Sequence, residues 1–426
     1  MRRLAFLLLA AFVCCFAGAQ IRGNNVEVVV VPDHADWTYA VGDKAKLTVS
    51  VLRSGVALDG AVVDIEAGPV MFPDVKKSGL SLKKGMMDYT ATMKAPGFYR
   101  LKVKTTVGGH RYEGLCTVGF SPEKIVPETK CPADFDAFWS KTLDDARATE
   151  LNPTRVLLPE RCTDKVNVYE VSFNNLSSGS RTYGILCVPK APGRYPALLR
   201  VPGAGVRPYP GDVWTASQGA VTLEIGIHGV PVTMPQTVYD NLASGALDGY
   251  WDCNIGERAR NYYKRVIVGA VRSVDYIATL PEWNGECLGV TGSSQGGFLS
   301  LAVAALDKRV TFLGVVHDAM CDYESALEGK ADGWPHYFYG RKNVPAGEVE
   351  NARYYDGVNF ARRVNVPGWY SFGYNDEVVP PNSSYGTYNI VTAKKTLSVY
   401  PRTGHYWYQE QWDEWMDFIF KQMNIK

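Results

Sequence analysis

One turn constrains the fold of this chain more than any other stretch. Residues 287–291 read as a short buried strand, the sequence GSSQG follows at 292–296, and residues 298–306 form an apolar, helix-forming run. G-x-S-x-G between a strand and a helix is a nucleophile elbow, a strained turn that presents a serine hydroxyl above the end of the strand. The flanking glycines give the backbone room to fold back on itself. The pattern predicts Ser294 as a nucleophile; the alternative is an ordinary Gly/Ser turn before a helix.

From residue 166 onward the sequence alternates between strand-like and helix-like segments. Strands are expected at 168–173, 182–188, 197–201, 220–225, 287–293, 310–316, 368–372 and 396–400, and helices at 132–150, 262–280 and 411–421. Such alternation is typical of the α/β class, with a mostly parallel sheet covered by helices on both faces. In these sheets the chemistry takes place at the carboxyl ends of the strands.

A serine nucleophile needs a general base, and the base needs an acid that orients it. Three histidines follow Ser294 in the chain. His405 lies in the loop between the last strand and the last helix, which is where this class of fold places its base. His317, at a strand end, and His336, in an aromatic stretch, are the weaker candidates. We expect activity to rise with pH as the base loses its proton, around the ordinary histidine value of about 6.5.

The acid is expected at the end of the strand before the last one. Asp376 follows the strand 368–372, with Glu377 as the reserve candidate. The alternative role for Asp376 is a helix N-cap ahead of the following prolines.

Two backbone N–H groups are expected to bind the oxyanion that forms when the serine attacks a carbonyl carbon. The N–H of Gln295 opens the helix after the elbow and faces the reacting centre. The second donor is expected in the loop after strand 197–201, where small residues let the backbone approach the substrate. We assign it to Ala204, with Gly205 in reserve.

The N-terminal third of the chain has a different pattern. Residues 45–51 and 99–104 alternate apolar and polar side chains, and Gly, Pro and Asp residues separate several such segments. An immunoglobulin-like β-sandwich domain is predicted over residues 20–120, a linker over 121–130 and an α/β domain over 131–426. The sandwich is interpreted as a packing or spacer module, with carbohydrate binding as the alternative.

The first 19 residues read as a signal peptide. Two arginines precede an apolar run at residues 4–16, and Ala-Gly-Ala at 17–19 fits the A-x-A cleavage pattern. The apolar run is shorter than the roughly 20 residues that a membrane-spanning helix needs. We therefore expect no membrane span and an exported protein, either periplasmic or extracellular.

The net charge and the cysteine content limit the classes of partner and cofactor that this protein is expected to bind. The net charge is +1, which argues against nucleic acid as the main partner. Nine cysteines include two within the signal peptide, so an odd number remains and at least one is unpaired. The sequence has no metal-ligand spacing of the H-E-x-x-H kind. We expect neither a metal nor another cofactor.

Further segments match one known family. They are residues 262–263, 270–272, 279–282, 289–297, 304–310, 355–361, 380–381 and 399–405. Over roughly residues 127–426 the sequence resembles the acetyl xylan esterase / cephalosporin C deacetylase family of the α/β-hydrolases. The resemblance implies removal of acetyl groups from acetylated oligo- or polysaccharides without a cofactor. It also implies Ser294 as nucleophile, Asp376 as acid and His405 as base, with Gln295 and Ala204 as backbone oxyanion donors.

Three positions depart from the family pattern. The usual R-G-Q motif is replaced by Gly-Ile-His-Gly at residues 226–229, Ala204 stands where an aromatic residue is usual, and Tyr406 where an acidic one is. These departures leave the triad in place. They bear on substrate choice and on the family's ring-like homo-oligomer.

Three alternative functions are consistent with the same residues. One is a serine peptidase of the prolyl-oligopeptidase type, although the N-terminal region is too short for a propeller and has no blade repeats. Another is an esterase for larger acyl groups, such as feruloyl sugars. The third is a carbohydrate-binding protein without enzymatic activity.

Overall fold

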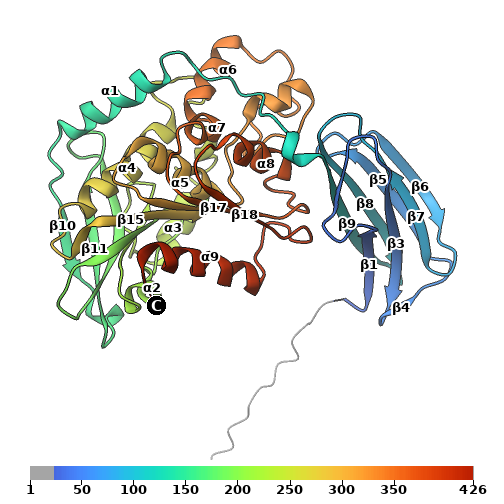
Figure 1. Cartoon of the computed structure of the whole chain (residues 1–426), viewed down its shortest axis with the longest axis horizontal. Helices are drawn as coiled ribbons and strands as arrows, with labels where there is room; N and C mark the ends of the chain where they lie inside the picture. Colours follow the sequence, from blue (N-terminus) through green and yellow to red (C-terminus); the bar gives the residue numbers. More distant parts are fainter. Residues whose placement is uncertain (1–23, 426) are drawn as a thin grey trace, which may run out of the picture.

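The structure, a computed structural model, describes residues 24–425. The predicted signal peptide at residues 1–19 lies outside the described residues. A strand-rich N-terminal part, blue in Figure 1, stands beside a larger part in which helices surround a central sheet. None of the helices within residues 24–425 is long and apolar enough to cross a membrane.

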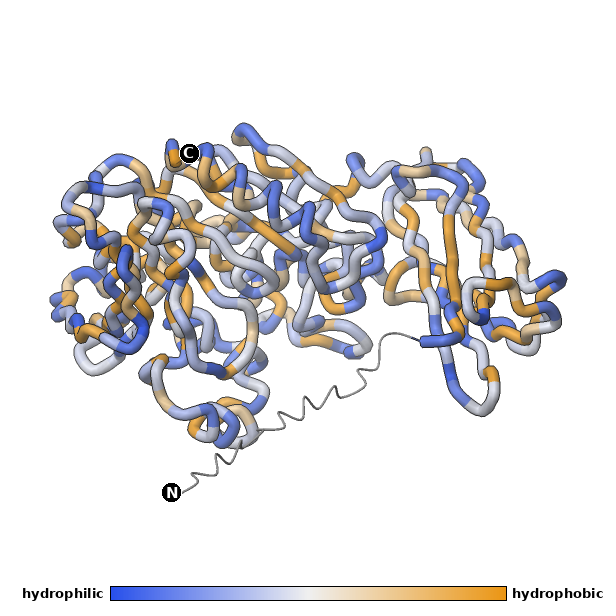
Figure 2. Tube along the Cα trace, turned by 90° about the horizontal axis from the view of Figure 1, so that it is seen from below, coloured by the Kyte–Doolittle hydropathy of each residue, from blue (hydrophilic) through white to orange (hydrophobic). Residues whose placement is uncertain are grey.

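The N-terminal strands form two sheets. One contains β1 (Val26–Pro32), β3 (Ala45–Arg53), β4 (Val56–Ala57) and β7 (Met86–Ala91); the other has the order β2 (Thr38–Tyr39), β9 (His110–Phe120), β8 (Gly97–Val107), β5 (Val62–Pro69) and β6 (Val75–Ser81). Alternate side chains of β3 are buried, with Leu47, Val49 and Val51 fully enclosed. Figure 2 shows long apolar stretches along these strands and polar loops at their ends. The immunoglobulin-like classification and the domain bounds stay predictions.

The central sheet has nine strands. Their order is β10 (Thr154–Leu157), β11 (Val166–Asn174), β12 (Arg181–Pro189), β14 (Val221–Gly226), β13 (Tyr195–Arg200), β15 (Trp283–Ser293), β16 (Phe312–Val316), β17 (Gly368–Phe372) and β18 (Lys395–Val399). The pairs from β14 to β18 are parallel, and those from β10 to β14 are antiparallel. The sheet is thus mostly parallel, as predicted, and β10 is a strand that the sequence reasoning did not anticipate.

Helices cover both faces of this sheet (Figure 1). On one face lie α1 (Phe135–Arg147), α4 (Tyr262–Ile277), α5 (Gln295–Leu306) and α7 (Gly357–Ala361), and on the other α2 (Val213–Ser217) and α9 (Gln409–Met423). The remaining helices are α3 (Gln236–Ala243), α6 (Ala346–Ala352) and α8 (Pro381–Ile390). The apolar core between sheet and helices fixes the strand ends that carry the site.

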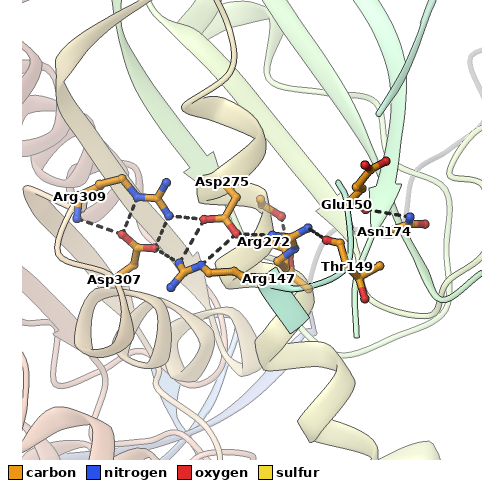
Figure 3. A network of polar contacts seen from close by, with 10 residues as sticks. Arg147, Thr149, Glu150, Asn174, Arg272, Asp275, Asp307 and Arg309 are labelled. Atoms are coloured by element: carbon orange, nitrogen blue, oxygen red, sulfur yellow. Dashed lines mark hydrogen bonds and ion pairs between the residues drawn. The ribbon is translucent and has the colours of Figure 1, made fainter. Parts of the chain in front are cut away.

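An ion-pair network fastens three elements of the helical layer (Figure 3). Asp275 of α4 accepts hydrogen bonds from Arg147 of α1 at 3.1 Å and from Arg272 at 2.8 Å, and it also pairs with Arg309. Asp307, at the end of α5, accepts a 2.8 Å bond from Arg147 and pairs with Arg309 as well. The arginine partners outweigh the burial of Asp275, so its pKa lies below the ordinary value.

The segment predicted as a linker is bound at its C-terminal end. Thr129 is buried, and its hydroxyl donates 2.9 Å to the Asp356 carboxylate. The backbone N–H groups of Glu128 and Thr129 donate to Asp322 at 2.8 and 2.9 Å. These contacts attach the chain to the large part before α1 begins.

Candidate active site

The elbow has the strained geometry that the sequence predicts. Ser294 directly follows β15 and is the N-cap residue of α5, with φ 60° and ψ −124°, a conformation rare for a residue other than glycine. A Cβ at Gly292 would lie 2.5 Å from the Val201 carbonyl oxygen, and one at Gly296 2.4 Å from the same atom. Both positions therefore require glycine. The strain presents Ser294 at the carboxyl end of the sheet.

The structure brings the predicted acid and base into direct contact. His405 Nδ1 lies 2.8 Å from Asp376 Oδ2. The Asp376 carboxylate is fully buried, and its Oδ1 accepts 2.8 Å hydrogen bonds from the N–H groups of Val378 and Val379. The carboxylate can only accept, so Nδ1 of His405 carries the proton and Nε2 is free to act as an acceptor.

A second histidine lies beside the same carboxylate. His317, at the end of β16, is buried, and its Nδ1 lies 3.3 Å from Asp376 Oδ2. Burial lowers the pKa of His317, so its ring is neutral near pH 7. Burial alone would raise the pKa of Asp376, but the two histidine rings outweigh it and hold this pKa well below its ordinary value. His317 thus faces the acid.

These three side chains also have the spacing of a metal site. The ligating atoms of His317, Asp376 and His405 lie within 4.8 Å of one another. The spacing reflects the hydrogen bond between His405 and Asp376 and the 3.3 Å approach of His317 to the same carboxylate.

The reserve candidates lie elsewhere. Glu377 turns away from His405, and its carboxylate pairs with Lys102 at 2.8 Å. His336 pairs with Asp332 at 2.8 Å. Among the histidines and acids considered from sequence, His405 and Asp376 are the pair in hydrogen-bond contact with each other.

The loop after β13 is held by a polar network that the sequence reasoning missed. Tyr250 accepts the Gly205 N–H at 3.1 Å and donates to Gln295 Oε1 at 3.0 Å. The Gln295 side chain also receives the Tyr263 hydroxyl at 2.8 Å and donates to the Pro202 carbonyl at 3.2 Å. No periodic pattern in the sequence relates these positions, which come from different loops and helices.

The network distinguishes between Ala204 and Gly205, the two candidates for the second oxyanion donor. The Gly205 N–H is occupied by Tyr250, whereas the Ala204 N–H has no hydrogen-bond acceptor among the described residues. The Gln295 N–H, at the start of α5, likewise has none. Among the described residues, the N–H groups of Ala204 and of Gln295, the residue after Ser294, are therefore without an acceptor.

Ser294, His405 and residues 203–205 line an open hollow of about 580 Å³. Trp251, Trp334 and Val378 line the same hollow and are apolar. The hollow gives a substrate access to the serine from solvent.

Comparisons with known proteins agree with this architecture. A family model described as acetyl xylan esterase (AXE1) matches residues 123–422. The chain belongs to the acetyl xylan esterase family. It is 38% identical to the acetyl esterase Axe7A of Xylanibacter ruminicola over 386 residues, which cover 89% of this chain and 86% of that protein.

Two solved structures of acetyl xylan esterases resemble this family member. The enzyme from Paenibacillus sp. R4 has a TM-score of 0.62 and 26% identity, covering 70% of this chain and 98% of its own. The enzyme from Thermoanaerobacterium sp. JW/SL YS485 has a TM-score of 0.59 and 23% identity, covering 71% and 97%. The family and the fold establish an α/β-hydrolase that acts as a carboxylic ester hydrolase.

Proposed function

We propose that this esterase removes acetyl groups from acetylated xylan or xylo-oligosaccharides through a Ser294–His405–Asp376 triad. The observation that carries the proposal is the 2.8 Å contact between His405 and Asp376, together with the hollow that His405 and Ser294 both line. The family membership supports the acetyl ester as substrate. The signal-like residues 1–19 support action outside the cytoplasm.

In the first half of the reaction His405 Nε2 accepts the hydroxyl proton of Ser294 as the serine oxygen attacks the acetyl carbonyl carbon. Asp376 holds the ring orientation and stabilises the imidazolium that forms. His405 then gives this proton to the sugar oxygen, which leaves as the alcohol while the acetyl group stays on the serine.

In the second half a water molecule attacks the acetyl-serine. His405 takes one proton from the water and returns it to the Ser294 oxygen, which releases acetate. In both halves the negative oxygen of the tetrahedral intermediate is bound by the N–H groups of Gln295 and Ala204. Loss of one such donor typically costs about 100-fold or more in rate.

The walls of the hollow support a saccharide as the alcohol half of the ester. Trp251 and Trp334 contribute aromatic surface to it, and their ring centroids are 5.7 Å apart. Indole surfaces suit the apolar face of a sugar ring, and the open mouth leaves room for a chain that continues on either side.

The test is acetate release from acetylated xylo-oligosaccharides by the parent protein and two variants. Ser294→Ala is expected to abolish release, and Asp376→Asn to reduce kcat by about 10³- to 10⁴-fold, because an amide cannot stabilise the imidazolium. Asp145→Asn, at an exposed carboxylate of α1 that pairs with Lys141 at 2.9 Å, serves as the matched control and should stay within a few-fold of the parent. Full activity of Ser294→Ala would exclude a mechanism in which Ser294 is the nucleophile.

The same proteins separate the alternative functions. An acyl-length series of esters distinguishes acetyl from larger acyl or feruloyl groups, and proline-containing peptides test for a peptidase. Saccharide binding without turnover, unchanged in Ser294→Ala, would identify a binding protein.

A further inference from the structure

The N-terminal sheets contact the loop that carries the proposed catalytic acid. Nη2 of Arg100, on β8, donates to the Asp376 carbonyl oxygen at 2.7 Å and to the Tyr374 carbonyl oxygen at 3.2 Å. On β9 the Thr117 N–H donates to Asn375 Oδ1 at 2.9 Å. Three consecutive residues, the acid among them, are therefore bonded to strands more than 250 positions earlier in the sequence.

These contacts are enclosed and mutually supported. The Arg100 side chain is only 13% exposed, and its Nε donates to Thr117 Oγ1 at 2.8 Å. Glu377 pairs with Lys102 at 2.8 Å and lies 3.8 Å from the Arg100 guanidinium. Because the guanidinium is a planar fork with fixed donors, two carbonyl bonds define the path of the loop more tightly than one would.

The position of this loop determines how Asp376 meets His405. Asp376 Oδ2 is 2.8 Å from His405 Nδ1, and the carbonyl of the same residue is the acceptor for Arg100. The family model begins at residue 123, so Arg100 lies outside the segment that the family model matches. We propose that the N-terminal sheets position the catalytic acid and that Arg100 is the main positioning residue. The inference rests on the proposed triad.

The first test compares Arg100→Ala and Arg100→Lys with the parent on a small acetyl ester. A misplacement of about 1 Å in a catalytic group can cost on the order of 100-fold in rate. We expect kcat to fall by at least about tenfold in Arg100→Ala, with KM nearly unchanged because Arg100 does not line the hollow. Arg100→Lys should recover part of kcat, and so should guanidinium ion added to Arg100→Ala at non-denaturing concentration.

The matched control is Lys76→Met, an exposed residue of the same sheet paired with Glu66 at 3.0 Å. It should leave kcat and KM unchanged. If Arg100→Ala does not fold, Asn375→Ala replaces it, since that change removes the bond to β9 without exposing a buried cation site. Parent-like kcat in folded Arg100→Ala or Asn375→Ala overturns the inference while Ser294→Ala is inactive. An active Ser294→Ala overturns the proposed function instead.

A second, independent observation concerns two exposed tryptophans. Trp214 of α2 and Trp412 of α9 are 51% and 36% exposed, and both line a hollow of about 420 Å³. Arg200, Asp212 and Glu224 supply charged groups to the same hollow. A neighbouring hollow of about 330 Å³ shares Trp412 with it and extends to Ser293, beside the nucleophile.

This combination suits a saccharide chain. Indole faces stack on the apolar faces of sugar rings, and charged side chains hydrogen-bond their hydroxyl groups. The second hollow shares Gly203, Arg207 and Ser293 with the hollow that contains Ser294, so a chain whose acetyl group is at Ser294 could continue along them. The geometry points to a subsite for the xylan chain at Trp214 and Trp412, which rests on the proposed function.

The test measures KM for acetylated xylan and for p-nitrophenyl acetate in the parent, Trp214→Ala and Trp214→Phe. We expect Trp214→Ala to raise KM for the polymer about tenfold, Trp214→Phe to raise it less, and both to keep the parent's KM for the small ester. In Ser294→Ala, non-acetylated xylo-oligosaccharide should change the tryptophan fluorescence.

Four results are decisive: three of them overturn the subsite, and the fourth contradicts the proposed function. Equal KM for the polymer in parent and Trp214→Ala, or fluorescence unchanged by the oligosaccharide, overturns the subsite. Chromatography in which Trp214→Ala dissociates a homo-oligomer also overturns it, because a second copy then covers the two tryptophans. A parent that hydrolyses neither acetyl ester contradicts the proposed function itself.

Discussion

At the scale of single residues, His228 combines a structural bond with a defined protonation state. Its Nε2 lies 3.0 Å from the Gly205 carbonyl oxygen, which can only accept, so Nε2 carries the proton. Its Nδ1 then accepts the Tyr262 hydroxyl at 2.7 Å. Burial, together with the charges of Arg265 and Arg207, lowers the pKa of His228 to about 4. The neutral ring thus binds the loop at residues 202–205, which contains the proposed oxyanion donor Ala204.

This protonation state predicts a pH-dependent stability. The unfolded histidine titrates near 6.5, so between pH 6.5 and 4 the unfolded chain binds more protons than the folded one. The neutral His228 ring therefore contributes fully to the free energy of unfolding above pH 6.5. This contribution, at most about 3 kcal/mol, is lost as the pH falls toward 4. His228→Gln keeps an N–H donor but does not titrate. Its unfolding free energy in urea should fall less between pH 7 and 4.5 than the parent's, and an equal fall would contradict the assignment.

At the scale of elements, the oxyanion loop at residues 202–205 depends on its neighbours for its shape. Tyr250→Phe removes the hydroxyl that joins Gly205 to Gln295. It leaves the half-buried Gly205 N–H without its acceptor, while the Gln295 side-chain oxygen keeps the Tyr263 hydroxyl, at a cost of up to about 1–3 kcal/mol. We expect kcat to fall about tenfold, less than for the loss of an oxyanion donor.

The control for this substitution is Tyr209→Phe. Tyr209 is buried and its hydroxyl has no hydrogen-bond partner among the described residues. Removing that hydroxyl should leave kcat unchanged. Equal kcat in both variants would mean that the Tyr250 hydroxyl does not shape the loop.

The elements also differ in how much of the site could be predicted from the sequence. The elbow is local, so its glycines and the strand and helix around it were legible in eleven residues. Asp376 and His405 could be proposed as a pair because each follows a recognisable strand, and the structure places their side chains 2.8 Å apart. The hydrogen bonds of Tyr250 that support the loop at residues 202–205 could not be predicted. Tyr250 lies in a segment without apolar periodicity, and its partners are 45 residues away in the chain. The contact of Arg100 with Asp376 spans 276 positions and has no local signal at all.

At the scale of the whole molecule, an apolar cluster joins the N-terminal sheets to the large sheet. Phe98 of β8 is fully buried, and its ring centroid lies 4.8 Å from that of Tyr374, next to the acid loop. Val70, Ala331 and Phe372 complete the cluster from both parts. Together with Arg100, this cluster makes the N-terminal sheets part of the support of the active site.

Phe98→Ala is therefore expected to weaken folding and catalysis together. Removing a buried aromatic ring costs roughly 3–5 kcal/mol, and the cavity would lie between the sheets and the acid loop. The parent should unfold in one calorimetric transition, and the variant at a lower temperature with reduced kcat. Val56→Ala, at a position 70% exposed on the N-terminal sheets, should change neither. If Phe98→Ala instead melted the N-terminal sheets in a separate step and left kcat at the parental value, the two parts would be energetically independent, and the active site would not depend on this cluster.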